Sequence, residues 1–305
     1  MTRIPREEAL AEVREMVLKH IKALPEPKPW QLPTEYGEGD EEVQVLMISD
    51  LQIGHLTPST SAKIIQNRAK RLTKGVIRIA EIHREAYPIK RLAVFLLGDI
   101  VQNDLIGKLV GLDELELVVM DQVFKIAVPI LTEMLLTLAE HYEQIDVYTV
   151  DGNHGSLGKY AAMKTNWDTV TYLAVAGQLK NHPRIKFSIE QELFYQRVKI
   201  WKWEFLLVHG DQIPMHLTLP FYGLTTRGMR WQGSLPGKFH YLCLGHFHVA
   251  SFLDWNDFEI FINGCFVTDD QYVLKKLGLR NSTVQITFGV HPRRGVTWRY
   301  KLWLD

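Results

Sequence analysis

The sequence predicts an α/β protein, and the order of its hydrophobic patterns carries this prediction. In the first half of the chain, short runs rich in β-branched and aromatic residues alternate with long segments of helical periodicity. After Arg184 the pattern changes to mostly short strand-like runs. Five of the strand-like runs end in polar residues of the types that bind metals. This combination predicts a site at the carboxyl ends of the strands.

The first expected element is a helix over residues 5–24, with Pro5 in its first turn and one apolar stripe. A linker rich in Pro, Gly and acidic residues follows, so we divide the chain into an N-terminal helix and linker (1–42) and a main domain (43–305). The expected elements of the first half of the main domain are strands at 43–49, 92–97 and 145–150 and helices at 62–86, 112–141 and 161–179. Later strands are expected at 185–189, 194–200, 203–208, 241–244, 252–255, 258–262 and 296–304, with an insertion loop at 213–240.

Composition excludes several classes of protein. The chain has 305 residues, of which 46% are hydrophobic and 23% charged, values that exclude a disordered, collagen-like or small disulfide-rich protein. The 35 Lys and Arg residues balance the 35 Asp and Glu residues, so any contact with a polyanion must be local. Cys243 and Cys265 lie in apolar stretches and are predicted to be core residues. Without a signal peptide or an apolar run of roughly 18 residues, we expect a cytoplasmic protein with no membrane partner.

The polar clusters that follow the strand-like runs carry the functional prediction. They are Ser49–His55, Gly98–Asp104, Asp151–Gly155, His209–Asp211 and Gly245–His248. Each cluster alone has an ordinary explanation: Asp99 can cap a helix, and Asn153 suits a turn. His246 and His248 are more informative, because residues two apart on an extended strand point the same way. The recurrence of five such clusters predicts a shared metal site.

In this order, the clusters resemble the signature of the calcineurin-like metallophosphoesterases: Asp-x-His, Gly-Asp, Gly-Asn-His, a lone His, and Gly-His-x-His. The resemblance covers residues 43–267 and implies a four-layer αββα sandwich of two mixed β-sheets flanked by helices, with two divalent ions at one edge. It implies that Asp99 bridges both ions, that Asp50, Gln52 and His248 hold the first, and that Asn153, His209 and His246 hold the second. His154 would protonate the leaving oxygen or stabilise the transition state. We expect manganese first, with iron, zinc, nickel or magnesium as alternatives.

Three positions depart from the family pattern. Gln52 stands where most members have His, and because an amide is a weaker, neutral ligand we expect looser metal binding there. Gln102 and Asn103 stand where the protein phosphatases of the family have an Asp that pairs with the catalytic His and an Arg that grips phosphate. A terminal phosphate group carries two negative charges and is typically bound by a cationic side chain such as Arg. The departures therefore argue against a phosphoprotein phosphatase and favour a diester substrate.

The segment 213–240 contains three cations, no acidic residue and several aromatic residues, a composition that suits a phosphodiester backbone with stackable bases. Arg227, Arg230 and Trp231 are its substrate-binding candidates; the alternative is that the aromatic side chains pack on the domain. Our leading hypothesis is a metal-dependent phosphodiesterase that cleaves DNA or RNA. It is similar to the nuclease subunits of DNA-repair complexes and to exonuclease-like proteins carried by phages, which implies a bacterial or phage-infected cytoplasm. The predicted partner is thus nucleic acid or a nucleotide; oligomeric state is not predicted.

Two alternatives stay open. One is a phosphomonoesterase or nucleotide pyrophosphatase, and the other is a non-catalytic nucleic-acid-binding scaffold of the same fold. Among the seven implied ligand positions only Gln52 departs from the family, and it still offers an oxygen donor, which argues against the scaffold.

Overall fold

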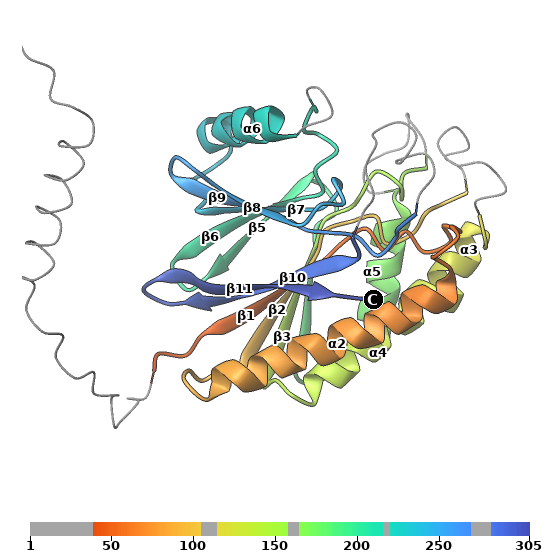
Figure 1. The fold of residues 1–305 in the computed structure, drawn as a ribbon, viewed down its shortest axis with the longest axis horizontal. Helices are drawn as coiled ribbons and strands as arrows, with labels where there is room; N and C mark the ends of the chain where they lie inside the picture. The colour runs from red at the N-terminus through yellow and green to blue at the C-terminus, as the bar shows by residue number, and fades with distance from the viewer. Residues whose placement is uncertain (1–38, 105–114, 158–164, 216–219, 270–281) are drawn as a thin grey trace, which may run out of the picture. The chain divides into compact units, whose positions relative to one another are not determined.

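A computed structural model describes residues 39–104, 115–157, 165–215, 220–269 and 282–305 of the chain. Residues Glu38–Asp305 belong to one compact unit. The predicted helix at 5–24 lies outside the described residues. Within the compact unit, two β-sheets lie between helices, and Figure 1 shows the resulting four layers from α6 at the top to α2 and α4 at the bottom. The predicted αββα sandwich is therefore confirmed.

The first sheet has six strands in the order β11-β10-β1-β2-β3-β4. Four of them are parallel: β1 (Val43–Ile48), β2 (Arg91–Leu96), β3 (Gln144–Thr149) and β4 (Ile185–Ile189). The strands β10 (Val284–His291) and β11 (Gly295–Trp303) are antiparallel to their neighbours, so the sheet is mixed. Side chains alternate along β1: Val45 and Met47 pack toward the second sheet, whereas Leu46 and Ile48 pack toward the helices.

The second sheet has five strands in the order β5-β6-β7-β9-β8. They are β5 (Tyr195–Ile200), β6 (Trp203–Val208), β7 (Tyr241–Leu244), β8 (Ser251–Trp255) and β9 (Phe258–Ile262). Phe205 and Phe261 from this sheet pack against Phe95 and Phe288 from the first sheet, which forms the core between the two sheets. The strands β6, β7 and β9 run parallel to one another.

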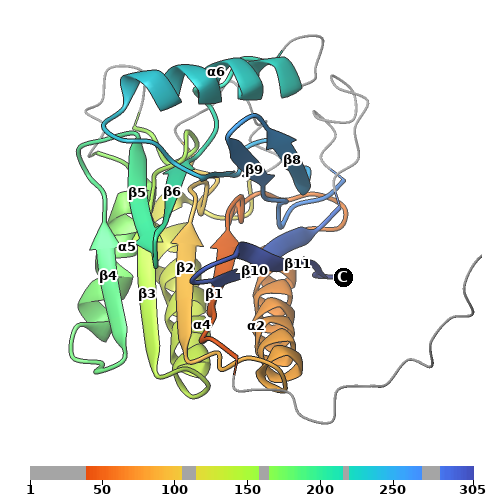
Figure 2. The same ribbon diagram turned by 90° about the vertical axis from the view of Figure 1, so that its left-hand side faces the viewer.

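Helices cover both outer faces of the sandwich, as Figure 2 shows from the side. The first sheet is covered by α2 (Ala62–Arg84), α4 (Val128–Ala139) and α5 (Trp167–Leu179), and α4 is preceded by the short helix α3 (Val119–Asp121) and the π-helical turn η2 (Gln122–Ala127). Ser61 caps α2 by accepting from the backbone N–H of Ile64. The second sheet is covered by α6 (Phe221–Ser234).

One helical stretch of the described chain, Val119–Ala139, is long and apolar enough to cross a membrane by length and composition. The sequence analysis found no such run. Its buried residues belong to the core between the first sheet and the helices, and this packing accounts for its apolar composition. Cys243 and Cys265 are buried, as predicted.

Two elements were missed by the sequence analysis. The strand β10 is buried along its whole length, and its alternation of Val284, Ile286, Phe288 and Val290 was the overlooked signal. The helix α6 occupies much of the segment 213–240, where an insertion loop was predicted. Its Gly223 and Gly228 lower helix propensity, but they let the helix lie close to Pro214 and Phe258, so packing outweighs propensity.

Candidate metal centre

The seven implied metal ligands lie at one edge of the sandwich, in loops that leave the carboxyl ends of five strands. Asp50 and Gln52 follow β1, Asp99 follows β2, Asn153 follows β3, His209 follows β6, and His246 and His248 follow β7. Because β1, β2 and β3 are parallel neighbours, their ends meet at the same edge, and the ends of β6 and β7 meet in the same way. The stacking of the two sheets brings both sets together.

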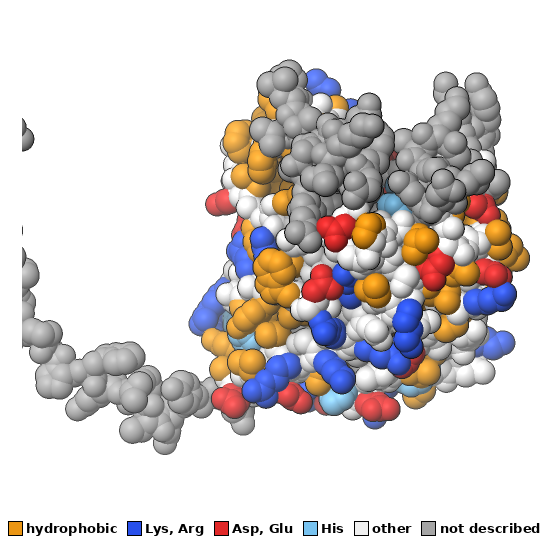
Figure 3. Space-filling model, turned by 45° about the vertical axis from the view of Figure 1, so that its right-hand side comes forward, with side chains coloured by type: hydrophobic (Ala, Val, Ile, Leu, Met, Phe, Trp, Pro, Cys, Tyr) orange, Lys and Arg blue, Asp and Glu red, His pale blue; other side chains and the backbone are white. Residues whose placement is uncertain are grey.

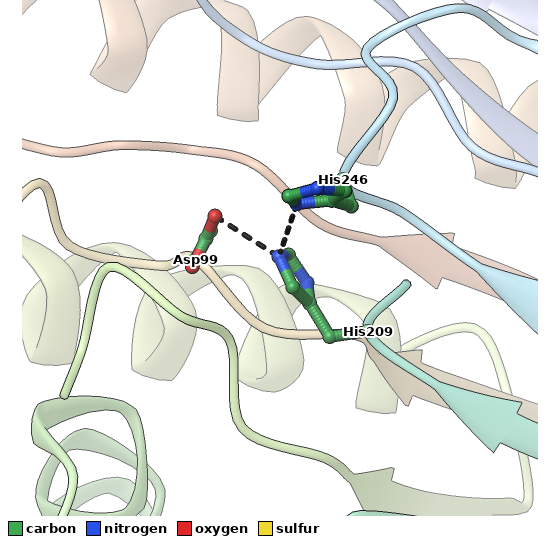
Figure 4. A group of neighbouring side chains, drawn as sticks. All are labelled: Asp99, His209 and His246. Atoms are coloured by element: carbon green, nitrogen blue, oxygen red, sulfur yellow. Dashed lines mark hydrogen bonds and ion pairs between the residues drawn. The ribbon is translucent and has the colours of Figure 1, made fainter. Parts of the chain in front are cut away.

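His209 is the centre of the first group of ligands. Its Nε2 atom lies 3.0 Å from Oδ2 of Asp99, 3.1 Å from Oδ1 of Asn153 and 3.3 Å from Nδ1 of His246. Figure 4 shows the three side chains Asp99, His209 and His246 converging from separate loops. The Nδ1 atom of His209 lies 2.7 Å from the carbonyl oxygen of Leu97, which can only accept, so Nδ1 carries a proton. The Nε2 atom is thereby directed at the other ligands.

The second group of ligands is built around Asp50. Oδ1 of Asp50 lies 3.2 Å from Nε2 of His248, and Oδ2 accepts from the backbone N–H of His246 at 3.0 Å. Nε2 of Gln52 lies 3.5 Å from Nε2 of His248 and 3.5 Å from Nε2 of His154. His246 joins the two groups, since its ring contacts the first and its backbone the second.

Most of these ligands have strained backbone conformations. Five of the seven have a positive φ, namely Asp50 (55°), Gln52 (45°), Asp99 (54°), His246 (67°) and His248 (59°). For residues other than Gly this conformation costs on the order of 1–3 kcal/mol each. The loops are also close together: a Cβ atom on Gly98 would lie 2.4 Å from the backbone nitrogen of Gly152. The strained backbone conformations are therefore concentrated at the predicted metal ligands.

The charges in the first group of ligands favour a positive charge near Nε2 of His209. Burial opposes the charge of Asp99, but His209 and His154 outweigh it and hold the pKa of Asp99 well below its usual value. Burial also opposes the charge of His209, but Asp99 raises the pKa of His209 to about 10. His246 behaves differently, because burial and the neighbouring His209 lower its pKa to about 4. The Asp99 carboxylate therefore favours the protonated form of His209, and a metal ion bound at this place would take over the role of that proton.

These residues fit a divalent metal ion. Ligand atoms of Asp99, His209 and His246 all lie within 4.8 Å of one another. Around Nε2 of His209, carboxylate and amide oxygens converge, and such acceptors repel one another unless a proton or cation lies among them. Oε1 of Gln52 is buried without a hydrogen-bond partner, which leaves a further oxygen available to a cation. Mixed imidazole and carboxylate ligands suit manganese, iron or zinc.

Asp168 is a site residue that the sequence analysis missed. Its carboxylate is fully buried and accepts from the backbone N–H groups of Asp99 (2.8 Å), Ile100 (3.0 Å) and Gly152 (2.9 Å). Burial and the nearby Asp99 raise the pKa of Asp168 to about 6. Asn166, which caps α5, also donates to the carbonyl oxygen of Gly152. Asp168 therefore ties the loops after β2 and β3 together. The Asn-x-Asp pattern at a helix start was its signal, but the helix was predicted to begin at 161.

The predicted substrate-binding residues lie on α6, which packs on the outer face of the second sheet. Arg230 is exposed and Arg227 is half-buried. Trp231 is only 7% exposed and packs near Phe194 in the core between α6 and the second sheet, so it has no free face for a base. For Trp231, the packing alternative given by the sequence analysis holds.

On the face shown in Figure 3, Lys and Arg side chains are interspersed with Asp and Glu.

No family model matches the sequence, and no curated protein matches it. Among solved structures, the chain is similar to Vps29 from Entamoeba histolytica complexed with Zn²⁺, with 12% identity, a TM-score of 0.39, and coverage of 86% of this chain and 99% of that one. It is similar to an archaeal phosphodiesterase, with 11% identity, a TM-score of 0.40, and coverage of 85% and 99%. It is similar to YfcE, a phosphoesterase from E. coli, with 14% identity, a TM-score of 0.38, and coverage of 85% and 99%. At these values the likeness concerns only the course of the chain, and the functional argument rests on the site itself.

Proposed function

We propose that this protein is a metal-dependent phosphoesterase that hydrolyses phosphodiester bonds of nucleic acid in the cytoplasm. The observation that carries the proposal is the convergence of Asp99, Asn153 and His246 on Nε2 of His209, next to the group formed by Asp50, Gln52 and His248. Two divalent ions held by these residues would polarise the phosphoryl oxygens and lower the pKa of a bound water.

His154 is the proposed proton donor. Its side chain is 16% exposed, which leaves it accessible to a substrate, and its Nε2 atom lies 3.8 Å from Oδ2 of Asp99. Its backbone N–H donates to Oδ1 of Asp99 at 2.8 Å, which holds the backbone of His154 next to the Asp99 carboxylate. As a water oxygen forms its bond to phosphorus and the bond to the leaving oxygen breaks, a proton on the His154 ring passes to the leaving oxygen.

The neutral side chains at positions 102 and 103 support a diester substrate. A monoester dianion would need a cation where Asn103 stands, whereas a diester carries one charge less. None of the contacts described for the metal ligands involves Lys or Arg. The exposed Arg230 on α6 offers a cation for a longer nucleic acid.

Three substrates test the proposal with the Mn²⁺-loaded protein: bis(p-nitrophenyl) phosphate, p-nitrophenyl phosphate and labelled single-stranded DNA. We expect the diester to be hydrolysed faster than the monoester, and the DNA to be cleaved. The His154→Ala variant should lose roughly 10²–10⁴-fold in rate on DNA. Replacement of His141, which is exposed and remote from the site, is the matched control. Faster hydrolysis of the monoester would contradict the nuclease assignment, and DNA binding without hydrolysis of any substrate would favour a scaffold.

A further inference from the structure

The side chain of Asn103 is fully engaged by the protein. It is 3% exposed, and its Nδ2 atom donates to the carbonyl oxygens of His154 and Ser156, both at 2.9 Å. Its Oδ1 atom accepts from the backbone N–H of Asp104 at 2.8 Å. Because Nδ2 faces two carbonyl oxygens and Oδ1 faces an N–H group, the orientation of the amide is determined. The residue that stands in place of a phosphate-gripping Arg thus holds the loop that carries His154.

The backbone of Asn103 is held in turn by Gln122. This side chain is fully buried at the first position of the π-helical turn η2. Its Oε1 atom accepts from the backbone N–H of Asn103 at 2.8 Å, and its Nε2 atom donates to the carbonyl oxygen of Leu117 at 2.7 Å. Asn103 has a φ of 67°, a conformation that Asn tolerates better than most residues. The chain of contacts therefore runs from η2 through Gln122 and Asn103 to the backbone of His154.

We propose that Asn103 is a positioning residue that sets the place of the His154 imidazole relative to Asp99. This inference rests on the proposed function, in which His154 gives its proton to the leaving oxygen. Asn103 lies in the loop after β2 and His154 in the loop after β3. One hydrogen bond from Nδ2 of Asn103 reaches the carbonyl oxygen of His154 and the other reaches that of Ser156, so together with the bond from the His154 N–H to Asp99 they fix the course of the backbone around His154. A displacement of about 1 Å in a reacting group can cost about 10²-fold in rate.

The leaving group distinguishes this role from a general structural one. DNA releases a basic sugar oxygen that needs a proton, whereas bis(p-nitrophenyl) phosphate releases a weakly basic phenolate that needs it much less. Displacement of His154 should therefore slow DNA cleavage more than hydrolysis of the nitrophenyl diester. A loss of folding or of metal would slow both reactions alike.

The test uses two variants of the full chain. Asn103→Asp keeps the size and tolerates the positive φ, but it faces the two carbonyl oxygens with an acceptor in place of a donor. Asn103→Gly removes the side chain and also tolerates the φ. Gln232→Ala is the matched control, because Gln232 holds Phe239 through two similar hydrogen bonds outside the site. We expect kcat on DNA to fall about 10²-fold for the Asn103 variants, with KM nearly unchanged and a fall of about tenfold or less on the nitrophenyl diester.

A second measurement does not depend on activity. In the metal-free protein, NMR signals of the His154 ring should shift in both Asn103 variants and stay in place in Gln232→Ala. Unshifted His154 signals, or equal losses on the two diesters, would overturn the positioning role. If the wild-type protein with Mn²⁺ hydrolysed no phosphoester, the proposed function would fail, while the NMR comparison would still decide whether Asn103 positions His154.

Discussion

The two groups of predicted metal ligands differ in how many of their ligand atoms have a partner within the group. The first group, which we call the His209 group (Asp99, Asn153, His209 and His246), has its other ligand atoms 3.0–3.3 Å from a single atom, Nε2 of His209. The second group, which we call the Gln52 group (Asp50, Gln52 and His248), has one carboxylate, one imidazole and one amide, and the amide oxygen has no hydrogen-bond partner. The proposed function therefore predicts a tight metal position at the His209 group and a loose one at the Gln52 group, because the loops after different strands supply different numbers of strong ligands.

The largest expected effect comes from Asp99, the residue that both metal positions would share. Asp99→Asn keeps the shape of the side chain but removes its charge, so both positions should weaken and hydrolysis should fall about 10³-fold. Calorimetric titration with Mn²⁺ and a rate assay measure the two effects. Asp254→Asn, at an exposed position of β8, is the control. If Asp99→Asn removed only one step of the titration, Asp99 would belong to one group alone.

A smaller effect is expected when the support beneath the His209 group is changed. Asp168→Asn replaces one accepting oxygen with an NH₂ group that faces backbone N–H donors, so the loops after β2 and β3 should separate. Loss of such a supporting hydrogen bond lowers metal affinity by about 10–100-fold. We expect the tight step of the titration to weaken and the loose step to change less, with the exposed Asp257→Asn as control. Equal weakening of both steps would show that Asp168 supports the whole edge.

The Gln52 group can be strengthened instead of weakened. Gln52→His supplies an imidazole, a better ligand for a transition metal than an amide, and should raise affinity at the loose position by about tenfold. The second step of the Mn²⁺ titration measures this gain, and Gln178→His, at an exposed position of α5, controls for an added His. Unchanged stoichiometry and affinity would refute the idea that the amide loosens this position.

The smallest expected effect is a pH dependence of stability that arises at His83, outside the metal centre. It has to be distinguished from the pH dependence that the histidines of the metal centre cause. His83 stacks on Trp298 at 4.2 Å, and burial lowers its pKa below 6.5, with Glu42 acting in the opposite direction. His83 therefore binds a proton more readily in the unfolded chain than in the folded protein. The contribution of neutral, packed His83 to the stability of the fold is present in full above pH 6.5 and is lost as the pH falls below that value.

Thermal unfolding at pH 7.5 and 5.5 measures this contribution. His83→Gln should reduce the fall in Tm between the two pH values by about 2 °C or less, whereas the exposed His141→Gln should leave it unchanged. An identical fall in the wild type and in His83→Gln would assign all of the acid sensitivity to other groups, including the ligand histidines.

Local pattern was sufficient for much of the fold. The strands expected at 43–49, 92–97, 145–150 and 203–208 match β1, β2, β3 and β6 to within about one residue. The strands β1, β2 and β6 are mostly apolar runs, and β3 alternates buried with half-buried residues, which are the two ordinary strand patterns. The helix expected at 62–86 matches α2, whose apolar stripe is continuous. The sequence analysis missed β10 although its alternating pattern was present, and it missed α6 because Gly223 and Gly228 lower the helix propensity of a segment that packing on the second sheet makes helical.

The sequence by itself determined which side chains follow the strands, and hence the type of chemistry, because strand ends and ligand residues are both encoded in short stretches of chain. Only the tertiary structure decided how those side chains pair. The contacts of His209 with Asp99, of Asp168 with the loops after β2 and β3, and of Asn103 with His154 join residues far apart in the chain. The first of these contacts forms only when the two sheets stack, and the other two form only when β2 and β3 pair within the first sheet. No local pattern could therefore have revealed that Asn103 binds the loop that carries His154.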